Sequence, residues 1–352
     1  MFADIQFLLH ERPLMHFLIT GHTGFKGSWL VMLLKSKGHT VSGISLDPDA
    51  ESLFNQARVQ ELVEQDFRLD IRDRVSLATT VKSVNPDVII HLAAQPLVRY
   101  SYAHPVETFE SNVLGTLNLL EATKGLANLK ATLIITTDKV YKNLGHKEGY
   151  VEDDALGGDD PYSASKAAAD IAAQSWVKSF AQTPVSITRA GNVVGGGDWA
   201  ADRLIPDLVR SYRVSDVPVI RNPNSIRPWQ HVLDCLNGYL LLVDSMVSQG
   251  THGEWNFGPN HLERHGVSEV IEGFAQNYGV TGTAWKLDEG KHPKESDFLL
   301  LNSTKARTQL GWVDQLNFKD TLKWTASWYR GFTEHGAREI TIEQIEAFLS
   351  QR

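Results

Sequence analysis

The sequence predicts an α/β protein with a doubly wound parallel sheet and a smaller mixed α/β lobe towards its C-terminal end. Three features predict this class. Short apolar runs alternate with helical patterns through the first half, a glycine-rich turn follows the first run, and polar motifs follow later runs. Strands that are apolar throughout are typical of parallel sheets covered by helices on both faces. In such folds ligands bind at the carboxyl ends of the strands, where these motifs fall.

The predicted strands are short, continuous apolar runs. They cover residues 16–20, 40–46, 67–69, 87–92, 131–136 and 185–189. The predicted helices place apolar side chains at helical spacing. They cover residues 25–37, 73–84, 105–126 and 161–180. The last helix has a clear start, because Asp159 or Asp160 can cap it and Pro161 stands where proline is tolerated.

Composition argues against several classes of protein. The chain has 352 residues, 42% of them hydrophobic, which is enough for a large core. A net charge of -8 gives no basic footprint of the kind that binds nucleic acid. Cys235 is the single cysteine, so no intramolecular disulfide or cysteine-rich metal site is expected, and no histidine spacing predicts a metal. We expect Cys235 to be a packed thiol.

The sequence shows no segment typical of a membrane or secreted protein. No apolar stretch approaches the roughly 20 residues of a membrane span. The first 14 residues lack the long apolar region of a signal peptide. We therefore expect a cytoplasmic protein without a membrane partner. Met15 directly precedes the first strand, so residues 1–14 are expected to form a terminal extension.

A glycine-rich turn joins the first predicted strand to the first helix. Its spacing, with Gly21, Gly24 and Gly27 three residues apart, differs slightly from the G-x-G-x-x-G fingerprint. Glycine lets backbone amides approach a pyrophosphate closely, and the N-terminus of the following helix supplies partial positive charge. The turn therefore predicts a dinucleotide cofactor, with a purely structural turn as the alternative. The predicted cofactor-binding residues here are Gly21, Thr23, Gly24, Phe25, Lys26 and Gly27.

Further cofactor-binding residues are predicted at the ends of the next strands. Asp47 follows the second strand, where an acidic residue can hydrogen-bond the adenosine ribose. A carboxylate there repels a 2′-phosphate, and no arginine directly follows it, so NAD is favoured over NADP. A turn aspartate before Pro48 is a nearly equal interpretation. The other predicted cofactor-binding residues follow the third and fourth strands: Asp70, Ile71, Ala93 and Ala94.

The chain changes character near Gly195. Beyond this residue, glycine, proline, tryptophan and dispersed arginines suggest a less regular lobe around a ligand, and residues 195–199 are expected to be flexible and polar. We predict a cofactor domain over residues 15–194. The substrate lobe is predicted over residues 195–335, with some of its segments returning to the main sheet. Residues 336–352 are expected to form a second terminal extension.

Tyr162 and Lys166 lie four residues apart on one predicted helix, so they share a face. A nearby ammonium favours the phenolate and is expected to lower the pKa of Tyr162 from its ordinary value of about 10. Such a tyrosine can take a hydroxyl proton while hydride leaves the same carbon for a nicotinamide. We predict catalytic and cofactor contacts for both residues.

Thr137, Asp138 and Lys139 follow the fifth predicted strand, where it opens into the cleft. The threonine hydroxyl can hydrogen-bond the oxygen that Tyr162 deprotonates. Asp138 can act as a general acid when burial keeps it protonated, and Lys139 can remove a proton beside a new carbonyl when it is neutral. Simple hydride transfer needs neither group, so the pair favours a dehydratase. A solvated ion pair at the start of a loop is the alternative.

Several longer motifs resemble those of the extended short-chain dehydrogenase/reductase family of nucleotide-sugar enzymes. They cover residues 20–29, 91–99, 137–139, 157–166, 189–199 and 226–232. The resemblance runs from about Met15 to Phe332. Within the family, the motifs look most like those of the 4,6-dehydratases that act on CDP-glucose. Related enzymes for dTDP-glucose carry Asp-Glu where this chain has Asp138 and Lys139.

The resemblance implies a cycle of oxidation, water elimination and reduction on one sugar. Tyr162 takes the C4 hydroxyl proton as the C4 hydride reduces NAD. Lys139 occupies the position of the C5 base, and Asp138 occupies that of the acid for the leaving 6-hydroxyl. Hydride then returns to C6, which gives a 4-keto-6-deoxy sugar.

The resemblance also implies substrate contacts and an assembly. The implied substrate-binding residues are Gln95, Arg99, Asn192, Arg203 and Arg227. Asn192 and Arg227 match positions that bind the diphosphate, which arginine holds in a bidentate geometry. Arg203 matches a position near the pocket for the nucleotide base. In the family, helices corresponding to residues 105–126 and 161–180 form a four-helix dimer interface, so a homodimer is expected.

Two other functions fit parts of this pattern. A sugar 4-epimerase or a dehydrogenase/reductase of the same family needs Thr137, Tyr162 and Lys166 but no acid and base at positions 138 and 139. A redox-sensing protein that binds NAD without turnover predicts a degraded tyrosine-lysine pair, and the pair is intact here. The leading prediction is an NAD-dependent nucleotide-sugar 4,6-dehydratase, which is a lyase.

Overall fold

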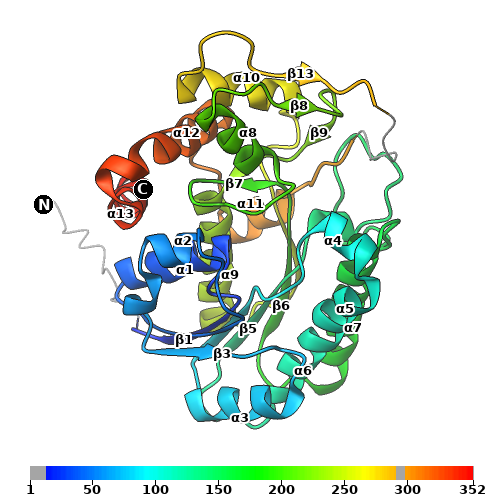
Figure 1. Cartoon of the computed structure of the whole chain (residues 1–352). Coiled ribbons are helices and arrows are strands. Elements are labelled where there is room, and N and C mark those ends of the chain that lie inside the picture. Colours follow the sequence, from blue (N-terminus) through cyan, green and yellow to red (C-terminus); the bar gives the residue numbers. More distant parts are fainter. Residues whose placement is uncertain (1–12, 291–297, 352) are drawn as a thin grey trace, which may run out of the picture.

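A single parallel sheet forms the centre of the structure (Figure 1). The computed structural model describes residues 13–290 and 298–351. Seven strands lie in the order β11-β6-β5-β4-β1-β2-β3, and every neighbouring pair is parallel. Their bounds are β1 His16–Thr20, β2 Thr40–Ser45, β3 Gln65–Arg68, β4 Val88–His91, β5 Ala131–Ile135, β6 Val185–Ala190 and β11 Gly253–Phe257. The predicted doubly wound parallel sheet is confirmed.

Strand β11 is the element of this sheet that the sequence did not predict. It comes from the segment assigned to the substrate lobe, and it pairs with β6 at the edge of the sheet. The register sets Trp255 opposite Thr188, and both side chains are buried. The strand itself is short and mixes polar with aromatic residues, so no continuous apolar run marks it in the sequence.

Helices cover both faces of the sheet because side chains alternate along each strand. In β1, Phe17 and Ile19 pack into a core cluster with α1 and α9, whereas Leu18 packs into a second cluster with α3 and α6. The helices around the sheet are α1 Phe25–Ser36, α2 Leu53–Gln56, η1 Val59–Leu62, α3 Arg74–Val84, α4 Val98–Ala103, α5 Pro105–Phe109, η2 Glu110–Leu114, α6 Gly115–Ala122, α7 Pro161–Phe180, α9 Val232–Gln249 and α11 Thr304–Leu310.

The long helix predicted over residues 105–126 is continuous but irregular. It consists of α5, the π-helical segment η2 and α6, and it ends at Ala122. Asn112 in η2 is buried, accepts a hydrogen bond from the Gln95 amide N–H (2.8 Å) and donates to Ser165 Oγ (2.9 Å). The π segment therefore sets Asn112 between the loop after β4 and helix α7.

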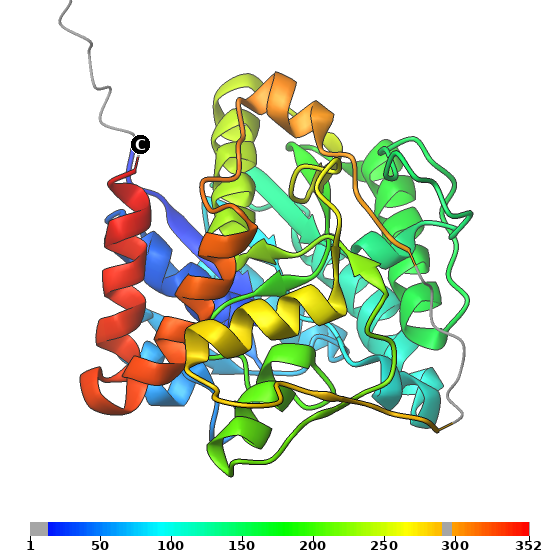
Figure 2. The same cartoon turned by 90° about the horizontal axis from the view of Figure 1, so that it is seen from above.

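The smaller lobe lies above the carboxyl ends of the strands in Figure 1. Helices α10 and α12 pack against each other in this lobe, and Figure 2 shows α10 in front of the sheet. The helices of the lobe are α8 Leu204–Arg213, α10 Val267–Tyr278 and α12 Phe318–His335. Three two-stranded ladders complete it: β7 Val193–Val194 with β10 Gln230–His231, β9 Ile226–Arg227 with β12 His265–Gly266, and β8 Val219–Ile220 with β13 Lys286–Leu287.

The run at residues 195–199 is packed, so the expectation of a flexible segment is wrong. The indole of Trp29 donates to the Gly196 carbonyl at 2.9 Å. A Cβ atom at Gly196 would lie 1.9 Å from Cγ of Trp328, so only glycine fits there. Two tryptophans distant in sequence hold this backbone between α1 and α12, and glycine-rich composition alone cannot reveal such contacts.

The C-terminal segment forms helix α13 (Ala337–Leu349), which packs against α1 and α12. Ile345 and Phe348 are fully buried in the main core, and the Trp328 indole donates to Thr341 Oγ1 at 2.9 Å. The predicted extension at residues 336–352 is thus largely core structure, whereas residues 1–12 lie outside the described residues. No helix within the described ranges is long and apolar enough to cross a bilayer.

Shortening Phe348 to alanine tests whether α13 stabilises the fold. Phe348→Ala is expected to lower the free energy of unfolding by about 3–5 kcal/mol, because it removes a fully buried aromatic ring and leaves a cavity. Glu346→Ala on the exposed face of the same helix is the control and is expected to change it by about 0.5 kcal/mol or less. Urea denaturation measures both. Equal midpoints for the two variants would contradict a core role for α13.

Candidate active site

The glycine turn between β1 and α1 is tightly packed and leaves no room for side chains at Gly21 and Gly27. Gly21 has a φ of +77°, and a Cβ atom there would lie 2.7 Å from the Ala93 backbone nitrogen. A Cβ atom on Gly27 would lie 2.2 Å from the Gly21 carbonyl oxygen. Gly24 caps α1 without a side chain, so the first amides of the helix have no side-chain partner at that position. A pyrophosphate fits such a cradle of backbone amides.

The other turn residues join the turn to its surroundings. Thr23 Oγ1 lies 2.6 Å from Ser45 Oγ at the end of β2. The Phe25 ring borders Gly195 in the lobe, where an added Cβ atom would lie 3.2 Å from Cζ of the ring. Lys26 sends its ammonium into the protein, 5.7 Å from the centre of the Tyr239 ring, where burial lowers its pKa.

Lys26 stands among the catalytic candidates themselves. Its charge interacts with Asp138, Arg203 and Lys166. No local pattern predicts this position of the amine, because the glycine spacing identifies Lys26 only as part of the cofactor turn.

The acidic residues predicted to hold the adenosine are partly engaged with arginines. The Asp47 side chain is 89% exposed at the end of β2, and Arg68 Nε from β3 lies 3.8 Å from its carboxylate. Asp70 accepts two side-chain hydrogen bonds from Arg72, at 2.9 and 2.6 Å. Ile71 is buried against Gly115. No arginine directly follows Asp47 in the sequence. Pairing of β3 with β2 nevertheless brings Arg68 close to Asp47 in the structure.

The loop after β4 lies against the glycine turn. The Ala93 amide donates to Thr20 Oγ1 at 3.3 Å, and Ala94 continues the same edge. The Gln95 side chain accepts from the Leu97 amide at 2.5 Å and donates to Thr108 Oγ1 at 2.9 Å. Both ends of this amide are therefore used inside the protein. Gln95 shapes the loop in this structure, and the predicted substrate contact of its side chain would require these bonds to break.

Thr137, Asp138 and Lys139 form a short turn directly after β5, with η3 covering Asp138–Val140. Thr137 Oγ1 donates to Asp138 Oδ1 at 2.9 Å and accepts from the Lys139 amide at 3.4 Å. Asp138 is only 2% exposed, and its Oδ2 makes no hydrogen bond to any described residue. Burial raises the pKa of Asp138, while the charges of Lys139 and Arg227 oppose this rise. The alternative of a solvated pair does not fit this burial.

Tyr162 and Lys166 lie on helix α7, whose predicted start at Asp160 and Pro161 is confirmed. Asp160 Oδ1 accepts from the Ser163 amide at 3.0 Å, and Pro161 is the first helical residue. The Lys139 ammonium lies 5.9 Å from the centre of the Tyr162 ring. The turn after β5 and the start of α7 therefore face one another.

The expected lowering of the Tyr162 pKa is wrong for this structure. Burial raises the pKa of Tyr162 to about 12, although the Thr137 hydroxyl and the charge of Arg203 act in the opposite direction. Lys166 Nζ donates to the Ile135 carbonyl at 2.9 Å. Burial, together with the charge of Lys26, lowers the pKa of Lys166 to about 8. Burial thus favours the neutral forms of both Tyr162 and Lys166, whereas an exposed lysine would keep its charge and stabilise the phenolate.

Two predicted substrate arginines from the lobe approach this cluster. Arg203 binds Asp198 at 3.0 Å, and its charge interacts with Tyr162. Arg227 donates to the Ile226 carbonyl at 2.8 Å, and its charge interacts with Asp138. Arg227 also lines a small cavity together with Trp229, His265 and Phe318.

The remaining predicted substrate residues lie less centrally. Arg99 forms an exposed ion pair with Asp202 at 2.6 Å. The backbone carbonyl of Asn192 accepts from the Gln230 amide at 3.0 Å. The Asn192 side chain is half-buried, and its contact with the diphosphate stays a prediction. Within the described part of the chain, no group of three or more histidine, cysteine, aspartate or glutamate side chains is arranged to hold a metal ion.

Sequence reasoning missed the buried polar network behind the catalytic turn. Arg189 and Asp170 form an ion pair whose side chains are 1% and 0% exposed. Asp170 stands four residues after Lys166 on α7, and this spacing could have indicated that it lies on the same face of the helix. Arg189 lies near the end of an apolar strand, where no pattern in the sequence indicates a partner.

Comparisons with known proteins agree with this geometry. The family model for GDP-mannose 4,6 dehydratase matches residues 18–325. The CDP-glucose 4,6-dehydratase of Salmonella typhimurium is 42% identical over 328 residues, which cover 89% of this chain and 91% of that protein.

Solved structures share the fold. A dTDP-glucose 4,6-dehydratase from Bacillus anthracis in complex with NAD is 26% identical, with a TM-score of 0.76 over 90% of this chain and 96% of that one. A UDP-glucose 4-epimerase from Thermotoga maritima with UDP-glucose has a TM-score of 0.79 over 91% of this chain and 100% of that one, and at 21% identity it shows the fold alone. Because the family model and the Salmonella relative both span most of the chain, this protein belongs to the GDP-mannose 4,6-dehydratase family of extended short-chain dehydrogenases/reductases.

Proposed function

We propose that this protein is an NAD-dependent 4,6-dehydratase that converts CDP-glucose to CDP-4-keto-6-deoxyglucose and water. The observation that carries the proposal is the turn after β5. A buried Asp138 with an unbonded carboxylate oxygen is followed by Lys139 beside Tyr162. An acid and a base next to the tyrosine that takes the C4 hydroxyl proton suit water elimination. The Salmonella relative, which is named as a CDP-glucose dehydratase, supports the choice of nucleotide and sugar.

The glycine turn and its neighbours are proposed to hold NAD. The close approach of Gly21 to Ala93 and of Gly27 to Gly21 leaves room for a pyrophosphate but for no side chain. Asp47 at the end of β2 is proposed to bind the adenosine ribose, with Arg68 beside it. When bound, NAD supplies a hydride acceptor at C4 of the sugar and a hydride donor at C6.

Tyr162 is proposed to take the proton of the C4 hydroxyl. Since burial raises its pKa to about 12, the phenolate needs nearby positive charge, and Arg203 is one described group that supplies it. The Thr137 hydroxyl lowers the pKa of Tyr162, so it is near enough to the phenol to share the same sugar oxygen. Lys166 anchors to the Ile135 carbonyl, which fixes its amine beside the end of β5.

Asp138 and Lys139 are proposed to remove water from the 4-keto sugar. The carbonyl at C4 acidifies the C5 hydrogen, and Lys139 takes this proton as the C6–O bond breaks. Asp138 gives its proton to the leaving hydroxyl, and a double bond forms between C5 and C6. The return of hydride to C6 and a proton to C5 completes a reaction with no net oxidation. Burial raises the pKa of Asp138, which favours the protonated form that a general acid requires.

Arg203 and Arg227 are proposed to bind the diphosphate and the nucleotide, together with Asn192. These arginines supply local positive charge in a chain whose net charge is -8. Guanidinium groups match phosphate oxygens with paired hydrogen bonds. The charge of Arg227 interacts with Asp138. A diphosphate bound by Arg227 is therefore proposed to direct the sugar end of the substrate towards the catalytic turn.

We further propose a homodimer in the cytoplasm. Large apolar side chains are exposed on the helices expected at the interface; they are Val106, Phe109, Leu114, Ile171 and Phe180. The helices that carry them, α5, η2 and α7, pack side by side. Exposed apolar side chains on adjacent helices favour a second copy as partner. The single, buried Cys235 suits a reducing compartment.

Incubation of the purified protein with CDP-glucose and NAD tests the function. We expect the alkali-induced absorbance of a 4-keto-6-deoxy sugar to appear without net NADH. Parallel incubations with dTDP-, GDP- and UDP-sugars identify the preferred base. A stereoisomer of the substrate would indicate a 4-epimerase, and stoichiometric NADH would indicate a dehydrogenase; either result would reject dehydration.

Replacing Lys139 tests its role as the C5 base. Lys139→Met is expected to keep C4 oxidation but to slow elimination by about 10²–10⁴-fold, because a general base contributes about that much. The measurements are NADH absorbance in a single turnover and exchange of the C5 hydrogen with deuterated solvent. Lys142→Met, an exposed lysine three residues on, is the matched control and should behave like wild type. Unchanged C5 exchange in Lys139→Met would refute the assignment.

Asp138 is expected to control the alkaline side of the pH profile. Its carboxyl is protonated below its raised pKa and loses the proton as the pH rises through that value, so kcat for elimination should fall with rising pH. Asp138→Asn keeps the shape but cannot donate a proton as an acid, and should slow elimination by about 10²–10⁴-fold. Its residual rate should lack this alkaline decline. An identical decline in the variant would assign it to another group.

A further inference from the structure

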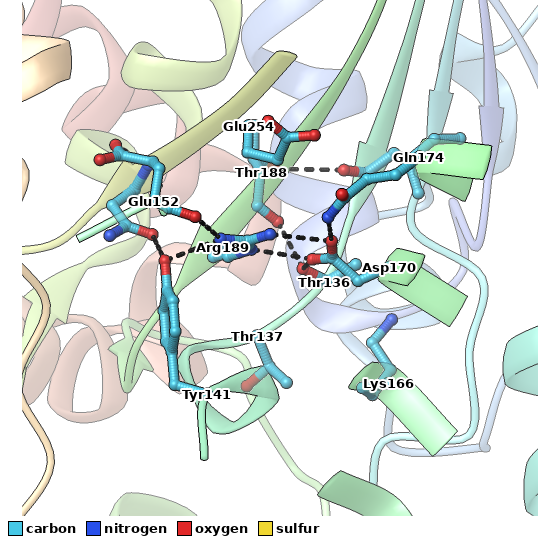
Figure 3. A network of polar contacts seen from close by, with 12 residues as sticks. Thr136, Thr137, Tyr141, Glu152, Lys166, Asp170, Gln174, Thr188, Arg189 and Glu254 are labelled. Atoms are coloured by element: carbon cyan, nitrogen blue, oxygen red, sulfur yellow. Dashed lines mark hydrogen bonds and ion pairs between the residues drawn. The ribbon is translucent and has the colours of Figure 1, made fainter. Parts of the chain in front are cut away.

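A buried ion pair lies directly behind the catalytic turn (Figure 3). Arg189 at the end of β6 binds Asp170 on α7 through two parallel hydrogen bonds, Nε to Oδ2 at 2.8 Å and NH2 to Oδ1 at 2.9 Å. Both side chains are almost completely inaccessible to solvent. A bidentate pair of this kind fixes the relative orientation of the two elements that carry it.

The Asp170 carboxylate also holds the end of β5. Thr136 Oγ1 donates to Asp170 Oδ2 at 3.1 Å, and Gln174 Nε2 donates to Oδ1 at 2.8 Å. Thr136 directly precedes Thr137. Lys166 lies one helical turn before Asp170 on the same helix. One carboxylate therefore connects the helix of Tyr162 and Lys166 to the beginning of the catalytic turn.

The Arg189 guanidinium reaches the other end of the turn through Tyr141. Its NH1 donates to the Tyr141 hydroxyl at 2.9 Å and to the Glu152 carbonyl at 2.8 Å. The Tyr141 hydroxyl in turn donates to Asn256 Oδ1 on β11 at 2.7 Å. Tyr141 stands two residues after Lys139 and is 2% exposed. The turn with Asp138 and Lys139 is thus tied to the same ion pair at both of its ends.

We infer that Tyr141 is a positioning residue for water elimination, whose hydroxyl, held between Arg189 and Asn256, sets Asp138 and Lys139 against the sugar. This inference rests on the proposed dehydratase function and adds a residue to it. Tyr141 acts through the turn and not on the substrate. The oxidation step depends on Tyr162 and Lys166 on α7. Asp170 holds this helix against Thr136 and Arg189, and Lys166 binds the Ile135 carbonyl, so none of these bonds involves Tyr141.

The chemistry of the hydroxyl suits a fixed position. It accepts a bond from a guanidinium and donates one to an amide oxygen, so its rotation is defined at both sides. Burial raises the pKa of Tyr141, which keeps the hydroxyl protonated and able to donate. In Tyr141→Phe the ring can keep its stacking on Tyr150, at 5.0 Å between ring centres, and Arg189 keeps both bonds to Asp170. The substitution therefore loosens one end of the turn alone.

The test is the ratio of two half-reactions in Tyr141→Phe with CDP-glucose and NAD. C4 oxidation is measured from NADH absorbance in a single turnover, and elimination from the 4-keto-6-deoxy product. We expect oxidation close to wild type and elimination slower by about 10²-fold, since a displacement of about 1 Å of a reacting group has an effect of this size. The matched control is Tyr212→Phe, which removes a hydroxyl bond of 2.8 Å to the Ala284 carbonyl in the lobe. Its ratio should equal that of wild type.

The ratio separates positioning from folding. Partial unfolding of Tyr141→Phe lowers the amplitudes of both half-reactions by the same factor, so the ratio of their rates remains readable. A ratio of elimination to oxidation equal to that of wild type, whether both rates are unchanged or slowed by the same factor, would overturn the inference and leave the dehydratase function intact. Failure of the wild type to form a 4-keto-6-deoxy sugar in the same assay would instead reject the function itself.

Discussion

The cost of removing charge from water governs the candidate active site. Burial lowers the pKa of Lys26 and brings that of Lys166 to about 8, and it raises the pKa of Asp138 and brings that of Tyr162 to about 12. All four groups are shifted towards their neutral forms. A neutral carboxyl is a ready proton donor, whereas a neutral phenol must first be made acidic by charges close to it. The proposed chemistry therefore depends on where the remaining full charges lie.

The arginines supply those charges, because a guanidinium keeps its proton even when it is desolvated. Arg203 and Arg227 bring theirs from the lobe towards Tyr162 and Asp138. Arg203 is paired with Asp198, but the pair of Arg189 with Asp170 differs in being almost completely buried and joined by two parallel hydrogen bonds. A buried pair of this kind is weak evidence for net stability, but breaking it leaves an uncompensated charge and is strongly destabilising. Its value here is geometric, because it joins two catalytic segments.

Local patterns in the sequence predicted most of the sheet and part of the site. The apolar strands, the glycine turn and the start of α7 at Asp160 depend on neighbours within a few residues, so they could be read directly. The errors came from contacts between distant segments. The direction of the Tyr162 pKa shift depends on burial that Lys166 alone does not indicate, and Arg68 meets Asp47 only because β3 pairs with β2. The packing of Gly196 against Trp328 is of the same kind.

The C-terminal helices connect the core to this charge arrangement. The Tyr329 hydroxyl on α12 donates to the Asp198 carbonyl at 2.5 Å, and the Asp198 carboxylate binds Arg203 at 3.0 Å. Helix α13 packs on α12, the helix that carries Tyr329, and the Trp328 indole beside it donates to Thr341 of α13. Since the charge of Arg203 favours the Tyr162 phenolate, the position of that charge depends on packing far along the chain from the tyrosine. A segment that sequence reasoning treated as an extension thus supports the electrostatics of the proposed oxidation step.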